Sequence, residues 1–259
     1  MRKNSVEVQA LQRALDILEV IGNSSSPVTL KNITAMVDLP KSTVYRLLSN
    51  LESRGYVRCG NDGRYTLGLK LLMMSQRMEQ GFELKHVARP YMVKLNELSK
   101  ESVHLGVLNN NKVLYVDTID SPQVIRLVAE VGSTNAVHCT ALGKALLIGH
   151  SDDAIKQVLH DAGMEKRTPY TLVTPESFLA EMQIVRAQGY ALDVCESNEH
   201  CCCVSAPIYN HHGDVVAAIS ISGPASRVSR DLMKNELAPK LKEATQAISQ
   251  FLGLFPDRN

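Results

Sequence analysis

A chain of 259 residues with 44% hydrophobic, 21% charged and 5% aromatic residues has the composition of an ordinary soluble protein, which excludes fibrous and disordered chains. No apolar run approaches the roughly 18 residues of a spanning helix, and the first residues lack the apolar segment of a secretory signal, so we expect a cytoplasmic protein with no membrane partner. Residues 1–75 hold 10 Lys or Arg against 6 Asp or Glu, whereas the rest of the chain is slightly acidic, and a basic front is compatible with a nucleic-acid partner.

The first 39 residues are predicted to form two helices. Within residues 5–22, apolar side chains recur at steps of three and four and share one face of an amphipathic helix: Val8, Leu11, Leu15, Leu18 and Ile21. After a loop at residues 23–27, Thr29 is placed to cap a short second helix that ends at Asp38-Leu39. The apolar face of the first helix must pack against a neighbour.

A third helix is predicted between Pro40, which suits a first turn, and Gly55, which suits a helix end. Its buried stripe is formed by Val44, Leu47, Leu48 and Leu51. At 100° per residue the opposite face is polar, with Thr43 and Asn50 at its margins and Lys41 in the first turn; its members are Ser42, Tyr45, Arg46 and Ser49. These side chains carry hydrogen-bonding groups suited to a polar partner.

Two short β-prone runs, residues 56–59 and 64–67, flank the turn-forming tetrapeptide Gly60-Asn61-Asp62-Gly63 and predict a hairpin. Helix, helix, short break, helix and hairpin is the order of a winged helix-turn-helix, whose second paired helix enters the DNA major groove. The alternative is a small helical packing domain in which Lys41 and Arg46 are merely solvated.

The rest of the chain predicts a second domain of the α+β class. Apolar residues from Leu67 to about Glu79 indicate a helix before the break at Gly81, so we expect a DNA-binding domain at 1–68, a linker helix at 69–81 and a second domain at 82–259. Strands are predicted at 102–108, 112–119, 124–130, 190–195, 201–208 and 214–222, and helices at 84–98, 141–149, 152–162 and 175–188. A final amphipathic stretch is interrupted by Pro239. Two groups of strands separated by helices favour an antiparallel sheet.

The segment LPKSTVYRLLSNLESRGYV, followed by the hairpin and YTLGLKLL, resembles the IclR family of bacterial transcription regulators. The resemblance runs along the chain and implies a regulator of transcription, more often a repressor, that binds double-stranded operator DNA. It implies that Ser42, Thr43, Tyr45 and Arg46, with Ser49 on the same helix face, meet operator DNA. Lys41 and the wing residue Arg64 would then contact phosphates.

The resemblance also implies a GAF-like effector-binding domain, and it rests there on residues 138–144, 189–193 and 217–224. On a strand, Ser220 and Ser222 share a face, so two hydroxyls can point together into a cavity, and Cys201 and Cys203 share a face of their own strand. Free backbone amides where a helix begins at Ala141 suit an anion such as a small carboxylic or sugar acid. The implied pocket consists of Leu127, Ala141, Leu142, Asp193, Cys203, Ser220 and Ser222.

The run His200-Cys201-Cys202-Cys203 departs from the family pattern, in which a glycine and one cysteine are usual, so the identity of the effector cannot be transferred. The six cysteines lack the spacing of a disulfide framework, and reduced thiols are expected. A redox-responsive or metal-responsive regulator stays open as an alternative, although alternation along a strand lets at most two of the three thiols converge, and we expect no metal site.

An enzyme is the other class to weigh, with a cysteine nucleophile and His138 or His200 as base. The chain has no Gly-x-Ser-x-Gly elbow, no Walker-type loop and no His-Glu-x-x-His, so we expect neither catalysis nor a cofactor. Because one recognition helix reads few bases, we expect a homodimer or a tetramer on a pseudo-palindromic operator.

Overall fold

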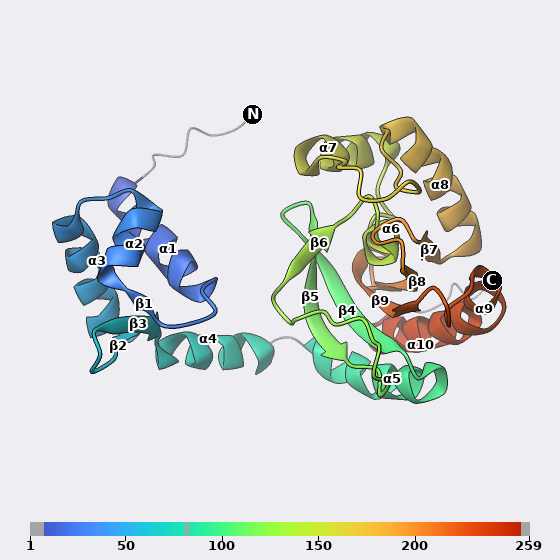
Figure 1. The fold of residues 1–259 in the computed structure, drawn as a ribbon. Helices are drawn as coiled ribbons and strands as arrows, with labels where there is room; N and C mark the ends of the chain where they lie inside the picture. Colours follow the sequence, from blue (N-terminus) through green and yellow to red (C-terminus); the bar gives the residue numbers. More distant parts are fainter. Residues whose placement is uncertain (1–7, 81–82, 255–259) are drawn as a thin grey trace. The chain divides into compact units, whose positions relative to one another are not determined.

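The structure is a computed structural model that describes residues 8–80 and 83–254. The chain divides into two compact units, Met1–Phe82 and Glu83–Asn259 (Figure 1). The break predicted at Gly81 and the part of the first predicted helix at residues 5–7 lie outside the described residues. Among the described helices, none combines the length and apolarity needed to cross a membrane.

The first unit has the predicted winged helix-turn-helix order. Its elements are α1 (Gln9–Gly22), β1 (Val28–Thr29), α2 (Leu30–Val37), α3 (Lys41–Ser53), β2 (Val57–Cys59), β3 (Arg64–Leu67) and α4 (Leu69–Gln80). The three strands form an antiparallel sheet in the order β1-β3-β2, in which β2 and β3 are the predicted hairpin. The Thr29 hydroxyl accepts a hydrogen bond from the amide of Asn32 at 3.3 Å and caps α2, as predicted.

The core of this unit confirms the predicted stripe of α3 and includes part of the predicted apolar face of α1. Val44 and Leu48 of α3 are fully buried. In α1 the buried residues are Ile17 and Ile21, whereas Val8, Leu11 and Leu15 are about half exposed or more. The C-terminal half of the predicted apolar face of α1 is therefore buried within this unit, and its N-terminal half is exposed.

The second unit is a three-layer α+β structure. Its strands are β4 (Ser102–Asn109), β5 (Lys112–Ile119), β6 (Thr134–Ala136), β7 (Ala191–Val194), β8 (Cys201–Tyr209) and β9 (Val215–Pro224). All neighbours are antiparallel, in the order β6-β5-β4-β9-β8-β7. The antiparallel sheet and five of the six predicted strands are confirmed.

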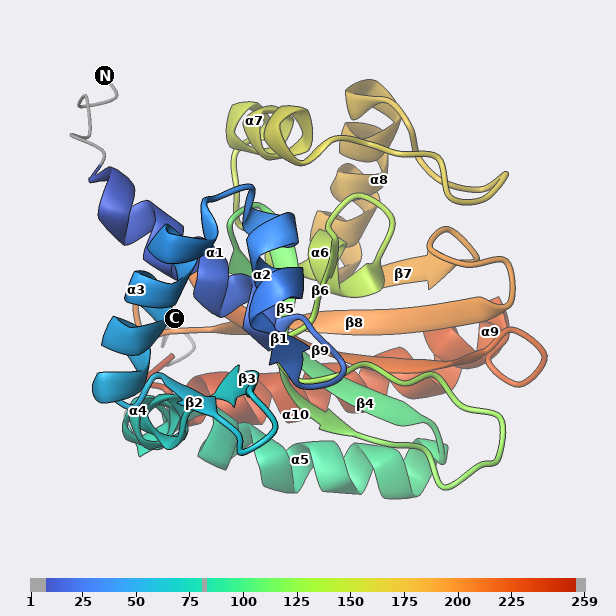
Figure 2. The same cartoon turned by 60° about the vertical axis from the view of Figure 1, so that its left-hand side comes forward.

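Helices cover both faces of this sheet (Figure 2). One face carries α5 (Glu83–Ser99) and α10 (Ala238–Phe251), and the other carries α6 (Ala141–Leu146), α7 (Asp152–Ala162) and α8 (Pro175–Gln188). The predicted interruption at Pro239 is a short helix, α9 (Arg230–Leu232), and a π-helical turn at Met233–Leu237, after which Pro239 lies in the first turn of α10. An amide is not needed at that position.

The strand predicted at residues 124–130 is wrong. These residues form an irregular loop, in which Val124 is 95% exposed and Val128 is 63% exposed. Two side chains bond to the loop backbone, which has no strand partner. The Ser102 hydroxyl donates to the carbonyl of Leu127 at 2.6 Å, and Arg227 donates to the carbonyl of Ile125 at 2.8 Å. β-Branched residues favour a strand only where a partner strand is free to pair, and here β6 pairs with β5 instead.

Gly143 allows α6 to approach the preceding backbone closely. A Cβ atom at this position would lie 2.2 Å from the carbonyl oxygen of Val137 and 2.3 Å from its Cα. Both obstructing atoms belong to the backbone, so neither can rotate away. The packing of α6 against the sheet therefore requires glycine.

We predict that Gly143→Ala lowers the free energy of unfolding of the second unit by about 3 kcal/mol or more, because overpacking against backbone cannot relax through a rotamer change. Urea unfolding followed by circular dichroism measures the loss. Gly149→Ala is the matched control, because its Cβ would lie 3.4 Å from the Cγ2 of Val215, an ordinary contact. Equal stabilities of the two variants would contradict the role of Gly143.

Candidate functional site

The outer face of α3 is polar and open. Lys41, Ser42, Tyr45, Arg46 and Ser49 are exposed, and Thr43 is half-buried at the margin. Neither Lys41 nor Arg46 forms an ion pair with any described residue. The polar face therefore presents two cations, hydroxyl groups and a phenol to the outside of its unit.

Arg64 lies at the start of β3, next to the wing turn. Its amide donates to the Asp62 carboxylate at 3.2 Å, and its Nε lies 3.5 Å from the same carboxylate. The side chain remains exposed, and among the described residues this weak surface pair is its one ionic contact. The structure thus places all seven residues predicted to meet DNA on the outer surface of the first unit.

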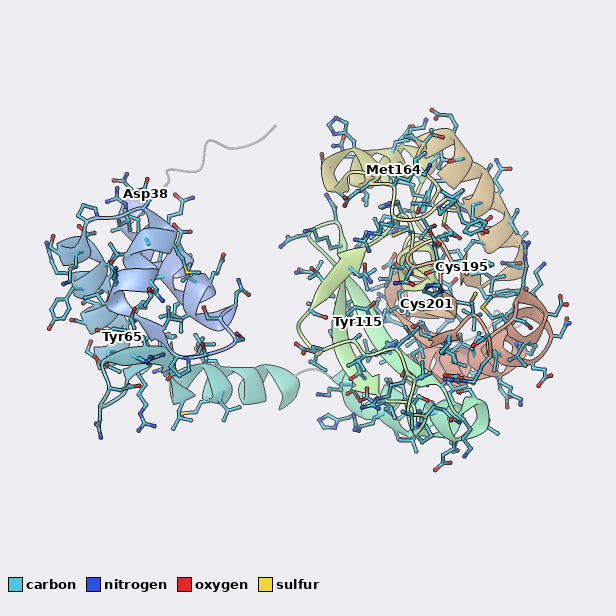
Figure 3. The ribbon with its side chains drawn as sticks, in the orientation of Figure 1. Asp38, Tyr65, Tyr115, Met164, Cys195 and Cys201 are labelled. Carbon is cyan, nitrogen blue, oxygen red and sulfur yellow. The ribbon has the colours of Figure 1, made fainter. Side chains whose placement is uncertain are left out.

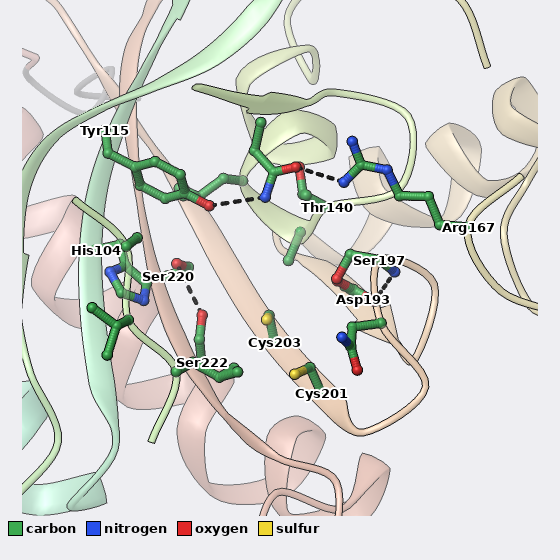
Figure 4. A pocket seen from close by; sticks show the side chains of 17 residues that line it. His104, Tyr115, Thr140, Arg167, Asp193, Ser197, Cys201, Cys203, Ser220 and Ser222 are labelled. Carbon is green, nitrogen blue, oxygen red and sulfur yellow. Dashed lines mark hydrogen bonds between the residues drawn. The ribbon is translucent and has the colours of Figure 1, made fainter. Parts of the chain in front are cut away.

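The second unit contains a cavity of about 280 Å³ between the sheet and the start of α6 (Figure 4). All seven residues predicted to form an effector pocket line it, from the loop before β6, the helix α6 and the strands β7, β8 and β9: Leu127, Ala141, Leu142, Asp193, Cys203, Ser220 and Ser222. The fold thus places Leu127 and Ser222, which are nearly 100 positions apart in the sequence, in the lining of the same cavity.

The sheet side of the cavity is a row of polar side chains on neighbouring strands. Cross-strand partners there are His104 with Ser220 and Cys203 with Ser222. The hydroxyl oxygens of Ser220 and Ser222 lie 3.4 Å apart, with His104 to one side and Cys203 to the other (Figure 4). Antiparallel pairing explains this row, because cross-strand partners point to the same face of a sheet.

The helix α6 begins at the opposite wall. The Thr140 hydroxyl accepts a hydrogen bond from the amide of Gly143 at 3.1 Å and caps the helix. The amides of Ala141 and Leu142 have no hydrogen-bond acceptor among the described residues. Both walls of the cavity thus offer hydrogen-bond donors.

A chain of three polar side chains borders the cavity beside β5. The Asn135 amide donates to the Tyr115 hydroxyl at 3.3 Å, and the Asn135 carbonyl oxygen accepts from the Arg167 guanidinium at 2.8 Å (Figure 4). Arg167 is the cation among the described residues that line the cavity. An anionic ligand would meet its positive charge there.

Asp193 lies in the wall of the cavity with both of its oxygens occupied. One oxygen accepts from the amides of Glu196 and Ser197 at 2.7 and 3.3 Å, and the other accepts from the Ser197 hydroxyl at 2.5 Å. Burial raises the pKa of Asp193, while these bonds from Ser197 and Glu196 oppose the rise. The carboxylate chiefly holds the turn after β7.

The buried side chain of Lys144 contacts the turn after β7, outside the cavity lining. The side chain of Lys144 is fully buried, and its ammonium group donates to the carbonyl of Leu192 at 2.8 Å and to Glu196 at 2.5 Å, with Glu181 at 3.8 Å. Burial raises the pKa of Glu196 to about 7 against the opposing effect of Lys144. The pair ties α6 to the turn that carries Ser197.

The cysteines of the second unit are poor nucleophiles where they are buried. Burial raises the pKa of Cys139 and of Cys201 to about 11 and that of Cys202 to about 12, and it raises the pKa of Cys203 as well. Few of these thiols are ionised at neutral pH, so they attack substrates slowly. Within the described residues, no group of three or more His, Cys, Asp or Glu side chains could hold a metal ion.

Sequence reasoning missed several residues that line the cavity: His104, Tyr115, Asn135, Thr140, Arg167, Ser197 and Asn198. His104 is 3% exposed, its Nδ1 has no hydrogen-bond partner among the described residues, and its ring stands edge-on to Tyr115 with centroids 5.5 Å apart. Burial lowers the pKa of His104 to about 4. The sequence feature that could have indicated His104 is its position within the apolar run Val103-His104-Leu105.

Residues 10–59 match the family described as the IclR helix-turn-helix domain, and residues 76–250 match the one described as the bacterial transcriptional regulator IclR C-terminal. The HTH-type transcriptional regulator KdgR of Escherichia coli is 32% identical over 252 residues, which cover 97% of this chain and 95% of that protein. The HTH-type transcriptional repressor AllR of E. coli is 31% identical and covers 95% of this chain, with 91% of its own length matched.

Solved structures share the fold. The IclR protein of Thermotoga maritima matches with a TM-score of 0.78 and 29% identity over 95% of this chain and the whole of that one. An IclR homologue of Microbacterium hydrocarbonoxydans, crystallised with 4-hydroxybenzoate, matches with a TM-score of 0.84 and 24% identity over 94% of this chain and 98% of that one. The second likeness is evidence for the fold alone.

We predict that His104 makes the second unit less stable in acid. Its pKa is 6.5 in the unfolded chain and about 4 in the folded one, so between these values the unfolded chain binds a proton that the folded unit does not. The free energy of unfolding should therefore fall as the pH drops from 6.5 to 4, by about 3 kcal/mol from this group.

Urea unfolding of the wild type and of His104→Gln across this pH range isolates the effect, because the variant lacks the titrating group. His212→Gln, in the exposed turn between β8 and β9, is the control and should retain the wild-type slope. Parallel curves for the wild type and His104→Gln would show that the histidine ionises equally in both states.

Proposed function

The chain belongs to the IclR family of bacterial transcription regulators, and from that premise we propose how its two units divide the work. It is a transcription regulator and not an enzyme, and its family binds operator DNA and small-molecule effectors. We propose residues 1–68 as the DNA-binding domain, 69–81 as the linker helix and 82–259 as the effector-binding domain. Because operator DNA is its target, the protein should act in the cytoplasm.

We propose α3 as the recognition helix. Ser42, Thr43, Tyr45, Arg46 and Ser49 would face the major groove, with Lys41 and Arg64 on phosphates. The observation that carries this proposal is the polar outer face of α3, whose cations have no partner among the described residues while the opposite stripe is buried. Arginine can read guanine through two hydrogen bonds, whereas lysine suits a phosphate.

The regulator would bind its operator as a homodimer, or as a tetramer of two dimers. Val8, Leu11 and Leu15 line the exposed half of α1 in one stripe, and a second copy of α1 is the partner that would cover it. A symmetric pair presents two recognition helices to a pseudo-palindrome. Saturation of one operator by a single chain would contradict this assembly.

The cavity of the second unit is our candidate for the effector pocket, formed by Leu127, Ala141, Leu142, Asp193, Cys203, Ser220 and Ser222. We add His104 and Arg167 to this set because both line the same cavity. A volume of about 280 Å³ lies at the lower end of ligand pockets, so the effector should be a small molecule.

The chemistry of the lining favours a carboxylic or sugar acid. Arg167 supplies a positive charge, and the carboxylate of Asp193 is already satisfied by its own turn. Ser220 and Ser222 can donate or accept hydrogen bonds, and the neutral ring of His104 can do the same. The carboxylate of such an acid would pair with Arg167, and its hydroxyl or carbonyl groups would bond to Ser220, Ser222 and His104.

Effector binding would change the affinity for the operator, with a coupling on the order of 1 to 3 kcal/mol. We propose repression relieved or strengthened by the effector, since relatives such as AllR are repressors. Fluorescence anisotropy of the protein on its own upstream DNA and on a scrambled duplex, with a panel of carboxylic and sugar acids, tests the whole scheme. Binding no tighter than to the scrambled duplex, with or without every acid, would contradict it.

We predict that Arg46→Ala weakens operator binding by about 1 to 3 kcal/mol, because it removes a base-reading guanidinium. The anisotropy titration at fixed salt measures the change. Lys234→Ala, which removes an exposed cation from the second unit, is the charge-matched control and should bind as the wild type does. Unchanged affinity of a folded Arg46→Ala variant would remove this residue from the readout.

We predict that Ser222→Ala leaves operator binding intact and raises the effector concentration for half response by roughly 5- to 30-fold, the loss of about 1 to 2 kcal/mol. Ser205→Ala is the control, because Ser205 is a buried hydroxyl on β8 that donates to the carbonyl of Ile219 at 2.8 Å and does not line the cavity. A normal response from Ser222→Ala would place the pocket elsewhere.

A further inference from the structure

Two thiols behind the cavity wall lie close enough to react with each other. The sulfur atoms of Cys195 and Cys202 are 3.7 Å apart. A disulfide requires about 2.05 Å between the sulfur atoms, so the two thiols would have to move about 1.7 Å closer to form one. Among the described cysteines, this is the one pair whose sulfur atoms are in contact.

The backbone brings these two thiols together in an unusual way. Val194 is the ladder partner of Cys202, so a regular strand would direct the next residue, Cys195, to the opposite face. Cys195 instead has a φ of 60°, in the left-handed region that residues other than glycine rarely adopt. Its amide still donates to the carbonyl of Cys201 at 3.1 Å, so the turn is hydrogen-bonded in this form.

The remaining cysteines are placed differently. Cys201 and Cys203 belong to the cavity face of β8, Cys139 is buried, and Cys59 lies in the first unit. Cys195 is half-buried, whereas Cys202 is 3% exposed (Figure 3 shows Cys195 beside Cys201). A reagent from solution therefore reaches Cys195 first, and Cys202 is positioned as the resolving thiol.

We propose that Cys195 and Cys202 form an oxidisable dithiol, a modification site at which a low-molecular-weight disulfide converts the two thiols into one intramolecular disulfide. The Cys195 thiolate attacks the small disulfide, forms a mixed disulfide and releases one small thiol. Cys202 then loses its proton, attacks the Cys195 sulfur as a thiolate and displaces the second small thiol, which takes up the proton. This step is slow, because burial raises the pKa of Cys202 to about 12, and it is helped by the closeness of the two sulfur atoms. The protein loses two electrons and two protons, and the small disulfide gains them.

The modification would act on the effector pocket. The bond would join the two ends of the turn at residues 196–201, whose Ser197 and Asn198 line the cavity and whose amides hold Asp193. A disulfide removes freedom from the segment that it closes. Oxidation of the dithiol would thus change the conformational freedom of Ser197 and Asn198, which line the proposed effector pocket.

Incubating the full-length native protein with oxidised glutathione tests the proposal directly. We expect two of the six thiols to be lost to titration, with no glutathione left on the protein. Digestion with a protease that cuts after Glu196 and Glu199 separates Cys195 from residues 201–203 unless a disulfide joins them, so the linked peptides should appear by mass spectrometry and disappear on reduction.

Three variants identify the pair. Cys202→Ser should stop at the mixed disulfide and retain one glutathione on Cys195, and Cys195→Ser should form no intramolecular disulfide. Cys139→Ser, a buried cysteine outside the cavity lining, should form the same disulfide as the wild type. A native protein that keeps all six thiols under conditions that oxidise the unfolded chain would overturn the proposal. So would a disulfide that survives in Cys195→Ser. The peptide map of the wild type gives an answer even if a variant fails to fold.

Discussion

The second unit depends on one buried charge. Lys144 is fully enclosed, and an ammonium group taken out of water costs several kcal/mol unless it is paired and hydrogen-bonded. Its partners, the carbonyl of Leu192 and the carboxylate of Glu196, belong to β7 and to the turn that follows. These contacts tie α6 to the end of β7, and Glu181 of α8, 3.8 Å away, adds a second negative charge near Lys144. Gly143, the preceding residue, admits the close approach that this arrangement needs.

The shape of the cavity follows from that constraint. With α6 held, the start of the helix faces the row formed by His104, Ser220 and Ser222 across a fixed gap. Both oxygens of Asp193 accept hydrogen bonds from its own turn, so this part of the wall is formed without a ligand. A preformed wall lowers the entropic cost of binding and lets a small ligand select one geometry. A site of this kind can bias a regulator without a large rearrangement of its own walls.

The sequence was sufficient for elements whose pattern is local, and insufficient where the outcome depends on a distant partner. Periodicity predicted the buried stripe of α3 and five strands of the sheet. It was wrong at residues 124–130, because β-branched residues cannot reveal that β5 already pairs with β6. It also could not show which half of the apolar face of α1 is buried within its own unit. His104 and Arg167 were missed because they reach the cavity from segments over 60 residues apart, and no spacing rule connects them. Asp193 was placed correctly, but its satisfied oxygens could only be seen in three dimensions.

Burial in the second unit keeps the cavity thiols protonated and His104 neutral, which disfavours catalysis by these groups. A cysteine nucleophile requires a thiolate, and burial raises the pKa of Cys201 to about 11, so this cavity thiol is protonated at neutral pH. His104 is kept neutral by the same desolvation and has no thiol or hydroxyl partner to activate among the described residues. A cavity with protonated thiols, a neutral imidazole and hydroxyl groups would recognise the proposed ligand through hydrogen bonds and leave it unchanged. That is the behaviour a transcription regulator requires, because the effector must be released intact for the response to be reversible.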